Sequence, residues 1–375
     1  MRLDEASVPG CYRNGMQRTP RTVTGMALLL GLLINGAGAI AQDSAPPKAT
    51  DLPGHRFGRT TPLDKAEAGI RIASYNVLNL FDPMDDPSLD GEYDDLPMAT
   101  SRDRCESIAR AIRAIDADIL CLQEVESEAA LRWFRDEFLE GMGYDHVASR
   151  DVGYYRGVEQ SVLSRFPITA STTWPDEDLS DMESRKTGEG WTRDGDLPTR
   201  FQRSPLMVDI EVPKKGRRDA YELTVVVVHH KSGRYRRQRE SEALQLVSIL
   251  DERLGKEKDL NLVVLGDYNA NPSDKCLGVY KDAGYVNAWE HRWKKGEGTR
   301  ELFRTHESDR AIDYIMLHPN IDSEVIDETF QVVGTLHPGD KYDWRNDDPP
   351  AGYAADHYPL VIDIRPVESR GRGPR

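Results

Sequence analysis

The sequence contains few cysteines for its length. Its 375 residues include only four, and Cys11 lies in an N-terminal segment that differs from the rest of the chain. The other three, Cys105, Cys121 and Cys276, are an odd number, so a disulfide framework is excluded. Cys105 and Cys121 lie on apolar faces and are expected to be core thiols, whereas Cys276 is expected in a loop.

Long apolar runs are also scarce. The one long run, Gly25–Ala41, follows two arginines and ends in Ala39-Ile40-Ala41, the small-residue pattern of a signal-peptide cleavage site. The alternative is a membrane anchor, but the run is short and rich in Gly and Ala. We therefore predict a signal peptide over residues 1–41, with Met16 as an alternative start. The product would be exported, periplasmic or extracellular, without stable membrane insertion.

An excess of positive charge is missing as well. The chain has 49 Lys and Arg against 64 Asp and Glu, a formal charge of −15. A protein that coats nucleic acid or another polyanion is normally basic, which argues against that class. An enzyme that gathers metal ions in an acidic cleft and carries a local basic rim remains open.

The middle of the chain has the pattern of one large domain. Residues 42–69 are rich in Pro, Thr and Ala and predict a linker, residues 367–375 are a charged tail, and the domain spans 70–366. Its strands are continuous apolar runs, so both faces of the sheets are expected to be covered, with helices outside. The predicted strands are Gly69–Val77, Asp118–Val125, Gln160–Ile168, Pro205–Val212, Tyr221–His230, Asn261–Leu265, Ala311–Leu317 and Pro359–Ile364. The predicted helices begin at Thr100 or Ser101, at Ser127 and at Glu240, the last with Leu244, Val247 and Leu250 on its apolar stripe.

Six of these strands carry polar residues within them or at their ends. One such residue is usually a satisfied hydrogen-bonding group, and Asp267 with Asn269 alone would fit an Asx turn. Six strands together predict a gathering of functional groups beyond the sheet. Four of the residues are carboxylates, which suit Mg²⁺, Mn²⁺ or Ca²⁺ and would repel one another without a cation. The residues are Asn76, Glu124, His229, Asp267, Asn269, Asp313, Asp356 and His357.

Seven short segments occur in a recognisable order. They are SYNVLNLF, LCLQEVE, VLSRFPI, VHHKSG, LGDYNANP, AIDYIML and ADHYPL. Over about Ile70–Asp363 they resemble the endonuclease/exonuclease/phosphatase superfamily, most closely its bacterial extracellular nuclease-like branch. The resemblance implies a deoxyribonuclease I-like fold: a four-layer α/β sandwich of two mostly antiparallel β-sheets packed face to face with helices outside.

The resemblance also implies roles for individual residues. Asn76 and Glu124 would help to hold a divalent cation, Mg²⁺ or alternatively Mn²⁺ or Ca²⁺, with Asp356 nearby. Asp267 would orient or deprotonate the attacking water, and Asn269 would bind the phosphate. The turn at the end of the preceding strand would let both side chains point at one phosphate.

Two histidines complete the implied catalytic set. His357 would stabilise the phosphate or move its proton, and Asp313 would orient it. His229 would protonate the leaving group or contact the phosphate. Because His230 follows directly, a one-residue ambiguity remains at this position, and the family's usual pattern favours His229.

Three groups of cationic residues are further candidates. Arg203 begins a strand and would contact phosphate, with a surface ion pair as the alternative. Lys231 would also bind phosphate, as the first member of a basic run that ends at Arg239. That run is either a polyanion-binding rim or a solvated helix start. Tyr154, Tyr155 and Arg156 would form a packed loop or stack a base.

These features predict an exported, divalent-metal-dependent phosphodiesterase, a monomeric endonuclease that hydrolyses DNA or RNA by in-line attack of water. One alternative is a sphingomyelinase-type phospholipid phosphodiesterase or another phosphoesterase. A lipid enzyme would need an exposed membrane-contact hairpin, for which the sequence offers only the lone Trp174 and Trp191. The other alternative is a non-catalytic binding protein on this scaffold, although every expected position is filled.

Overall fold

The computed structural model of the chain describes residues 57–86, 98–180, 200–213, 220–290, 303–336 and 347–368. All of them belong to one structural unit, Pro46–Arg375. The predicted signal peptide, the linker up to residue 56, most of the tail and Trp191 lie outside the described residues. Within the described ranges, no helix is long and apolar enough to span a membrane.

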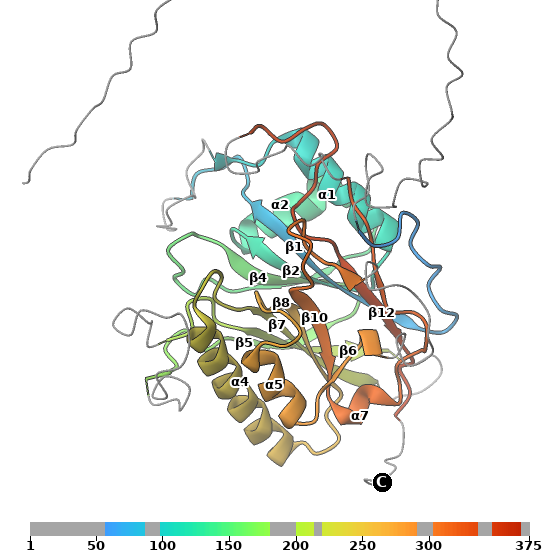
Figure 1. Cartoon of the computed structure of the whole chain (residues 1–375). Coiled ribbons are helices and arrows are strands. Elements are labelled where there is room, and N and C mark those ends of the chain that lie inside the picture. Colours follow the sequence, from blue (N-terminus) through green and yellow to red (C-terminus); the bar gives the residue numbers. More distant parts are fainter. Residues whose placement is uncertain are drawn as a thin grey trace, which may run out of the picture. The chain divides into compact units, whose positions relative to one another are not determined.

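Two six-stranded sheets form the centre of the domain (Figure 1). The first sheet has the order β11 (Gln331–Val332), β12 (Leu360–Ile364), β1 (Ile70–Leu80), β2 (Ile119–Val125), β4 (Glu159–Ser164) and β3 (His146–Ser149). The second has the order β5 (Ile168–Thr172), β6 (Leu206–Val212), β7 (Tyr221–His229), β8 (Leu262–Asp267), β10 (Asp313–Leu317) and β9 (Val286–Asn287). Only β1 with β2 and β7 with β8 pair in parallel, so both sheets are mostly antiparallel, as predicted.

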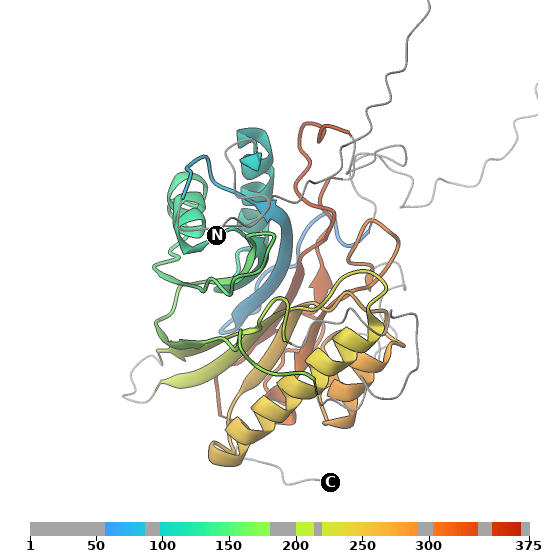
Figure 2. The ribbon, with the colours of Figure 1, turned by 90° about the vertical axis from the view of Figure 1, so that its left-hand side faces the viewer.

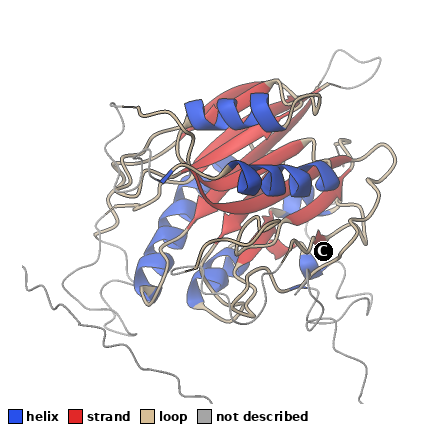
Figure 3. Cartoon of the chain, turned by 90° about the horizontal axis from the view of Figure 1, so that it is seen from above, coloured by secondary structure: helices blue, strands red, loops and turns tan. Residues whose placement is uncertain are grey.

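The sheets pack face to face, and helices cover their outer faces. Apolar side chains of both sheets, such as Ile72 and Ile362 from the first and Val225 and Val263 from the second, form one core between them. The helices α1 and α2 lie on one side of the sheets and α4 and α5 on the other (Figure 2), and Figure 3 shows helices outside the strands. This arrangement is the predicted four-layer sandwich. The helix bounds are Arg102–Ile115 for α1, Glu128–Phe138 for α2, Arg236–Lys256 for α4, Lys275–Asp282 for α5 and Pro319–Asp322 for α7.

The helix starts and apolar stripes follow the sequence with one exception. The side chain of Ser101 accepts a hydrogen bond from the backbone N–H of Arg104 and that of Ser127 from Ala130, so both predicted caps are present. The helix α4 begins four residues earlier than predicted, and its buried face includes Leu246 in place of the predicted Leu244. This face packs on the second sheet, and Leu246 is buried among the apolar side chains of that sheet.

Three local expectations differ from the structure. Residues 57–69 of the predicted linker pack on the domain: Phe57 is buried in the core between the sheets, and the Ala66 N–H donates to Asp363. The predicted strand Gln160–Ile168 is two strands, since β4 ends at Ser164 and β5 begins at Ile168 after a proline. Cys276 is not a loop residue but a buried member of α5, where its thiol fills an apolar core.

Glu159 at the start of β4 gives the first testable prediction. Its carboxyl is buried, one oxygen accepts from the Val152 N–H at 3.2 Å, and Oε2 has no hydrogen-bond partner among the described residues. Burial raises the pKa of this carboxyl from 4.5 to about 9. The folded protein therefore keeps a proton that the unfolded chain loses, and stability falls as the pH rises through this range.

We expect Glu159→Gln to remove this pH dependence. The stability of the wild type relative to the variant should fall by up to about 1.4 kcal/mol per pH unit between pH 5 and 9. Urea unfolding of both proteins across this range measures the difference. If the free energies of unfolding of the two proteins changed equally with pH, Glu159 would be ionised in the folded state, contrary to this prediction.

Candidate active site

A distortion at the ends of β1 and β2 places Glu124 in the site. Both neighbouring strands skip this residue, since Gln123 and Val125 are paired but Glu124 is not. Its φ of 65° is in the left-handed region, which non-glycine residues seldom adopt. Such a bulge turns a side chain away from the regular alternation of the strand. The Glu124 carboxylate accordingly accepts from the Asn79 N–H of β1 at 3.1 Å.

Arg104 of α1 holds the distorted end of β1. Its guanidinium donates to the carbonyl oxygens of Val77, Leu78 and Asn79, where the strand leaves its regular register. It also donates to the Ala354 carbonyl at 2.9 Å. One half-buried cation therefore ties the segment after Asn76 to the segment just before Asp356.

The end of β8 has an equally special backbone. Gly266 has a φ of 142°, and a Cβ there would lie 2.0 Å from the Val228 carbonyl oxygen of β7. The glycine thus lets β7 and β8 approach closely. Asn269, two residues past the strand, has a φ of 49°. Its N–H donates to Asp267 Oδ1 at 2.7 Å, so the Asx turn, the alternative reading of these two residues, is present, and Oδ2 is left for other partners.

Asp267 Oδ2 is the point at which the two sheets' polar residues converge. Asn76 Nδ2 of the first sheet lies 3.3 Å away, and Asn269 Nδ2 lies 2.9 Å away. His229 Nε2 is at 3.3 Å and His357 Nε2 at 3.8 Å. Five of the eight strand-end residues therefore share one buried location.

The Asp313 carboxylate holds the ring of His357. Its Nδ1 lies 3.0 Å from both carboxylate oxygens of Asp313. Asp313 pairs with Asp267 across β10 and β8, and its Oδ2 accepts from the Thr305 hydroxyl at 2.6 Å. This contact fixes the ring so that Nε2 faces Asp267.

The two adjacent histidines have different surroundings. His229 faces the site, where its Nε2 is 3.3 Å from Asp267 and 3.6 Å from Glu124. His230 faces the opposite way, between Glu242 at 3.2 Å and the Tyr280 hydroxyl at 3.1 Å. The structure thus places the predicted His229, not His230, beside the other candidate residues.

Arg203 is buried next to His229. Its NH1 lies 3.0 Å from His229 Nδ1, and its NH2 donates to the His230 carbonyl at 3.2 Å. The guanidinium lies over the Tyr154 ring, 5.1 Å from its centre. A surface ion pair, the alternative weighed for Arg203, is therefore wrong, because the side chain is inside the site.

The titratable side chains of the site have shifted pKa values. Burial alone would raise the pKa of Asp267, but His357 and His229 hold it well below its ordinary value. Burial would lower the pKa of His357, but Asp313, Asp356 and Asp267 raise it well above its ordinary value. Burial and the charge of Arg203 lower the pKa of His229 to about 4. At neutral pH the site therefore combines a carboxylate, an imidazolium and a neutral imidazole.

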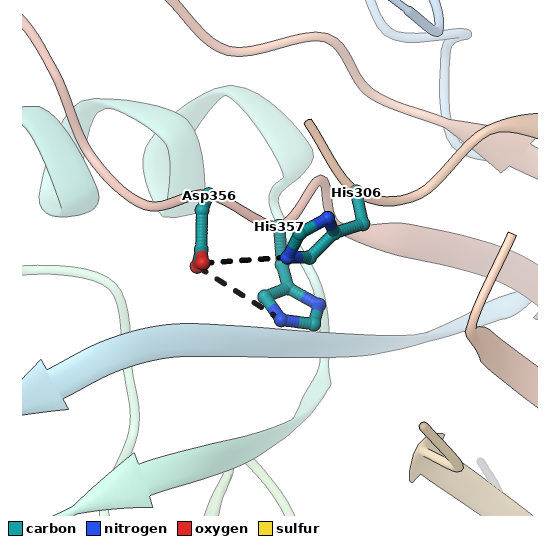
Figure 4. Close-up of side chains that lie close together, drawn as sticks. All are labelled: His306, Asp356 and His357. Carbon is teal, nitrogen blue, oxygen red and sulfur yellow. Dashed lines mark ion pairs between the residues drawn. The ribbon is translucent and has the colours of Figure 1, made fainter. Parts of the chain in front are cut away.

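Two groups of the described side chains could hold a metal ion, His306 with Asp356 and His357, and Asp267 with Asp313 and His357; the predicted ligand Glu124 is in neither group. Burial would raise the pKa of Glu124, but Arg156, His229 and Arg203 lower it below its ordinary value, while the charge of Asp356 acts against them. Asp356 Oδ1 is buried and has no hydrogen-bond partner among the described residues. His306, which the sequence analysis did not single out, lies with its Nε2 3.3 Å from Asp356 Oδ2 (Figure 4).

The basic run after His230 divides into buried and exposed members. Arg237 and Arg239 are buried, and Arg239 donates to the Lys231 and Gly233 carbonyls. Lys231 is half-buried with its ammonium 4.9 Å from the centre of the Tyr235 ring. The run is therefore partly buried, with Arg234 and Arg236 as its exposed arginines, and polyanion binding by these exposed members stays a prediction.

The loop before β4 contributes to the site. Arg156 contacts Glu124 Oε2 at 3.3 Å and also donates to the Asn79 side chain. Tyr154 packs with Phe81 and Val158, as a packed loop requires. The Tyr155 ring, in contrast, is 51% exposed.

The chain matches the model of the Endonuclease/Exonuclease/phosphatase family over residues 73–329, and it belongs to this family, whose members hydrolyse phosphate esters. Enzymes of the family are commonly dependent on divalent metals, and the site has carboxylates and histidines that could bind one. None of the curated proteins compared with the chain matches it.

The chain is similar to several solved structures, and the first one named here has the same fold. The catalytic domain of human Nocturnin with bound sulfate is 18% identical, with a TM-score of 0.51 over 80% of this chain and 95% of that one. A mannosyl-6-phosphatase of Bacteroides thetaiotaomicron is 17% identical, with a TM-score of 0.47 over 78% and 98%. D. rerio TDP2 in complex with a single-strand DNA product is 14% identical, with a TM-score of 0.47 over 79% and 99%.

Proposed function

We propose that the chain is an exported, divalent-metal-dependent phosphodiesterase that hydrolyses DNA or RNA. The observation that carries the hydrolytic part is the convergence on Asp267 Oδ2 of groups from both sheets: Asn76, Asn269, His229 and His357. A buried carboxylate held by amide and imidazole groups is suited to orient a water and accept its proton.

The reaction would be a direct displacement at phosphorus. The water oxygen forms a bond to phosphorus while the ester P–O bond breaks, and the water proton passes to Asp267. His357, which is charged at neutral pH, is the group available to give a proton to the leaving oxygen, and the neutral His229 would contact the phosphate. Arg203 and the Asn269 amide would donate hydrogen bonds to the phosphate oxygens, whose charge changes in the transition state.

The carboxylates of the site fit a divalent cation. Asp356 Oδ1 is a buried acceptor without a partner among the described residues, and Glu124 adds a second carboxylate together with the side-chain oxygen of Asn76. Oxygen ligands of this kind suit Mg²⁺, Mn²⁺ or Ca²⁺. When bound, the cation would neutralise phosphate oxygens and stabilise the leaving oxygen.

Cationic and aromatic side chains beside the site favour nucleic acid. Arg156, Arg203 and the half-buried Lys231 act on one another electrostatically, which together with burial lowers the pKa of Lys231. Tyr155 directly precedes Arg156 in the chain, and its exposed ring offers a face for a base. Trp174, a candidate for lipid contact, instead packs against the core under α4 and α5, which disfavours a phospholipid substrate.

The test offers the purified protein three substrates in parallel: supercoiled plasmid, sphingomyelin vesicles and bis-p-nitrophenyl phosphate. Each is incubated with Mg²⁺, Mn²⁺ or Ca²⁺, and with EDTA as the control. We expect metal-dependent nicking of the plasmid and its loss in His357→Ala. Lipid hydrolysis with intact plasmid would replace this proposal by a phospholipase function. Inactivity on all three would contradict the proposed nuclease function.

A further inference from the structure

His306 lies beside the Asp356–His357 pair without an assigned role. It belongs to the segment before β10, and Figure 4 shows its ring next to that of His357, with both rings near the Asp356 carboxylate. The two ring centres are 4.6 Å apart and the rings are nearly perpendicular. The three side chains could each offer one atom to a metal ion, so a ligand role and a supporting role for His306 must be compared.

Backbone hydrogen bonds hold His306 against Asp356. The Glu307 N–H donates to the Asp356 carbonyl at 2.9 Å, and the Tyr358 N–H donates to the Thr305 carbonyl at 2.7 Å. The residues on both sides of His306 are therefore paired with the residues on both sides of His357. The distance between His306 and Asp356 is consequently set by the backbone and not by a mobile side chain.

The hydrogen bonds of the ring decide between the two roles. The Ser308 N–H donates to His306 Nδ1 at 2.9 Å. A ring nitrogen that accepts a hydrogen bond carries no proton, so the proton of the neutral imidazole is on Nε2. Nε2 lies 3.3 Å from Asp356 Oδ2 and faces it with an N–H, whereas a metal ligand would need a free lone pair at that position.

The other carboxylate oxygen is left open by this arrangement. Asp356 Oδ1 is buried, is 3.9 Å from His357 Nε2 and has no hydrogen-bond partner among the described residues. One oxygen is thus engaged by an imidazole N–H while the second is free. Ligating carboxylates in proteins are commonly held by such a hydrogen bond, which fixes their orientation toward the ion.

We infer that His306 is a positioning residue for a divalent cation: its Nε2–H holds Asp356 Oδ2 so that Oδ1 is presented to the ion. The inference rests on the proposed function, because it requires that Asp356 bind the metal. It assigns no ligand role to His306 and leaves His357 free for the phosphate.

Two substitutions, His306→Gln and His306→Leu, test whether His306 acts by donating a hydrogen bond or only by occupying its volume. The side-chain amide of glutamine can place an N–H where Nε2 lies, whereas leucine has a similar size and no donor. The matched control is His146→Leu, because His146 pairs with Ser164 at the strand end opposite Glu124. Thermal unfolding in EDTA shows whether each variant folds as the wild type does.

Calorimetric titration with Mn²⁺ and with Mg²⁺, without substrate, measures binding directly. We expect His306→Leu to weaken binding by about 10- to 100-fold, and His306→Gln and His146→Leu to stay within a few-fold of the wild type. Wild-type affinity in His306→Leu would overturn the inference. An equal loss in the Gln and Leu variants would overturn it too, because it would make His306 a ligand. If the wild type bound neither ion, the proposed metal dependence would be contradicted. This result is distinct from failure of the inference, because it is obtained before any variant is compared.

Discussion

Asp267→Asn is expected to lower kcat for phosphodiester hydrolysis by about 10²- to 10⁴-fold. The substitution keeps the size of the side chain but removes the charge that would accept the water proton. It also replaces an oxygen at the point where Asn76, Asn269 and His229 converge. Because the low pKa of Asp267 keeps this side chain ionised at neutral pH, the wild type carries a negative charge here that asparagine cannot supply.

The measurement is the steady-state rate on bis-p-nitrophenyl phosphate at saturating Mn²⁺ or Mg²⁺. Asp251→Asn, an exposed position on α4, is the matched control and should retain wild-type activity. Circular dichroism confirms that both variants are folded. A rate for Asp267→Asn within a few-fold of the wild type would remove this carboxylate from the reaction.

Gly266→Ala is expected to destabilise the fold by about 3 kcal/mol or more. The added Cβ would lie 2.0 Å from the Val228 carbonyl oxygen, which is backbone of the neighbouring strand and cannot turn aside. The φ of 142° adds strain for any residue with a side chain. Because β7 carries His229 and β8 carries Asp267, separating these strands would also disrupt the site.

Gly278→Ala is the matched control for this substitution. Gly278 lies within α5, and a Cβ there would meet nothing within 4 Å. Alanine in a helix is favoured over glycine by about 1 kcal/mol, so this variant should be as stable as the wild type or more so. Urea unfolding compares the two variants, and equal midpoints for them would show that the strands can separate at little cost.

The strands and helices can be predicted from the sequence because their signals are local and repeated, whereas the four-layer sandwich is implied by the resemblance of the seven segments. Continuous apolar runs such as Leu262–Leu265 can be recognised as buried strands, and Ser101 and Ser127 mark helix starts through their own side chains. The short edge strands β9 and β11, of two residues each, are too brief to give such a pattern. They form because β10 and β12 offer free edges.

The site is predictable in its residues but not in its contacts. The strand-end polar residues identify Asp267 and His357, yet no periodicity shows that Glu124 is an extra residue in a bulge. Arg237 and Arg239 belong to a run that looks solvated, and only the folded structure shows that they are buried. His306 is a single polar residue in the sequence. Only the fold shows that it lies beside Asp356, which is fifty positions further along the chain.

The pairing of β12 with β1 has a consequence for the time at which activity appears during folding. Asp356 and His357 immediately precede the last strand, which pairs with the first strand of the domain from Ile70 to Ser74. This contact closes a loop of almost the whole domain, and contacts between residues so distant in sequence form slowly. A chain whose C-terminal strand has not yet docked has neither the Asp313–His357 pair nor Asp356 in place. Recovery of hydrolysis after dilution from denaturant would therefore report the last long-range step of folding, not the earlier formation of the helices.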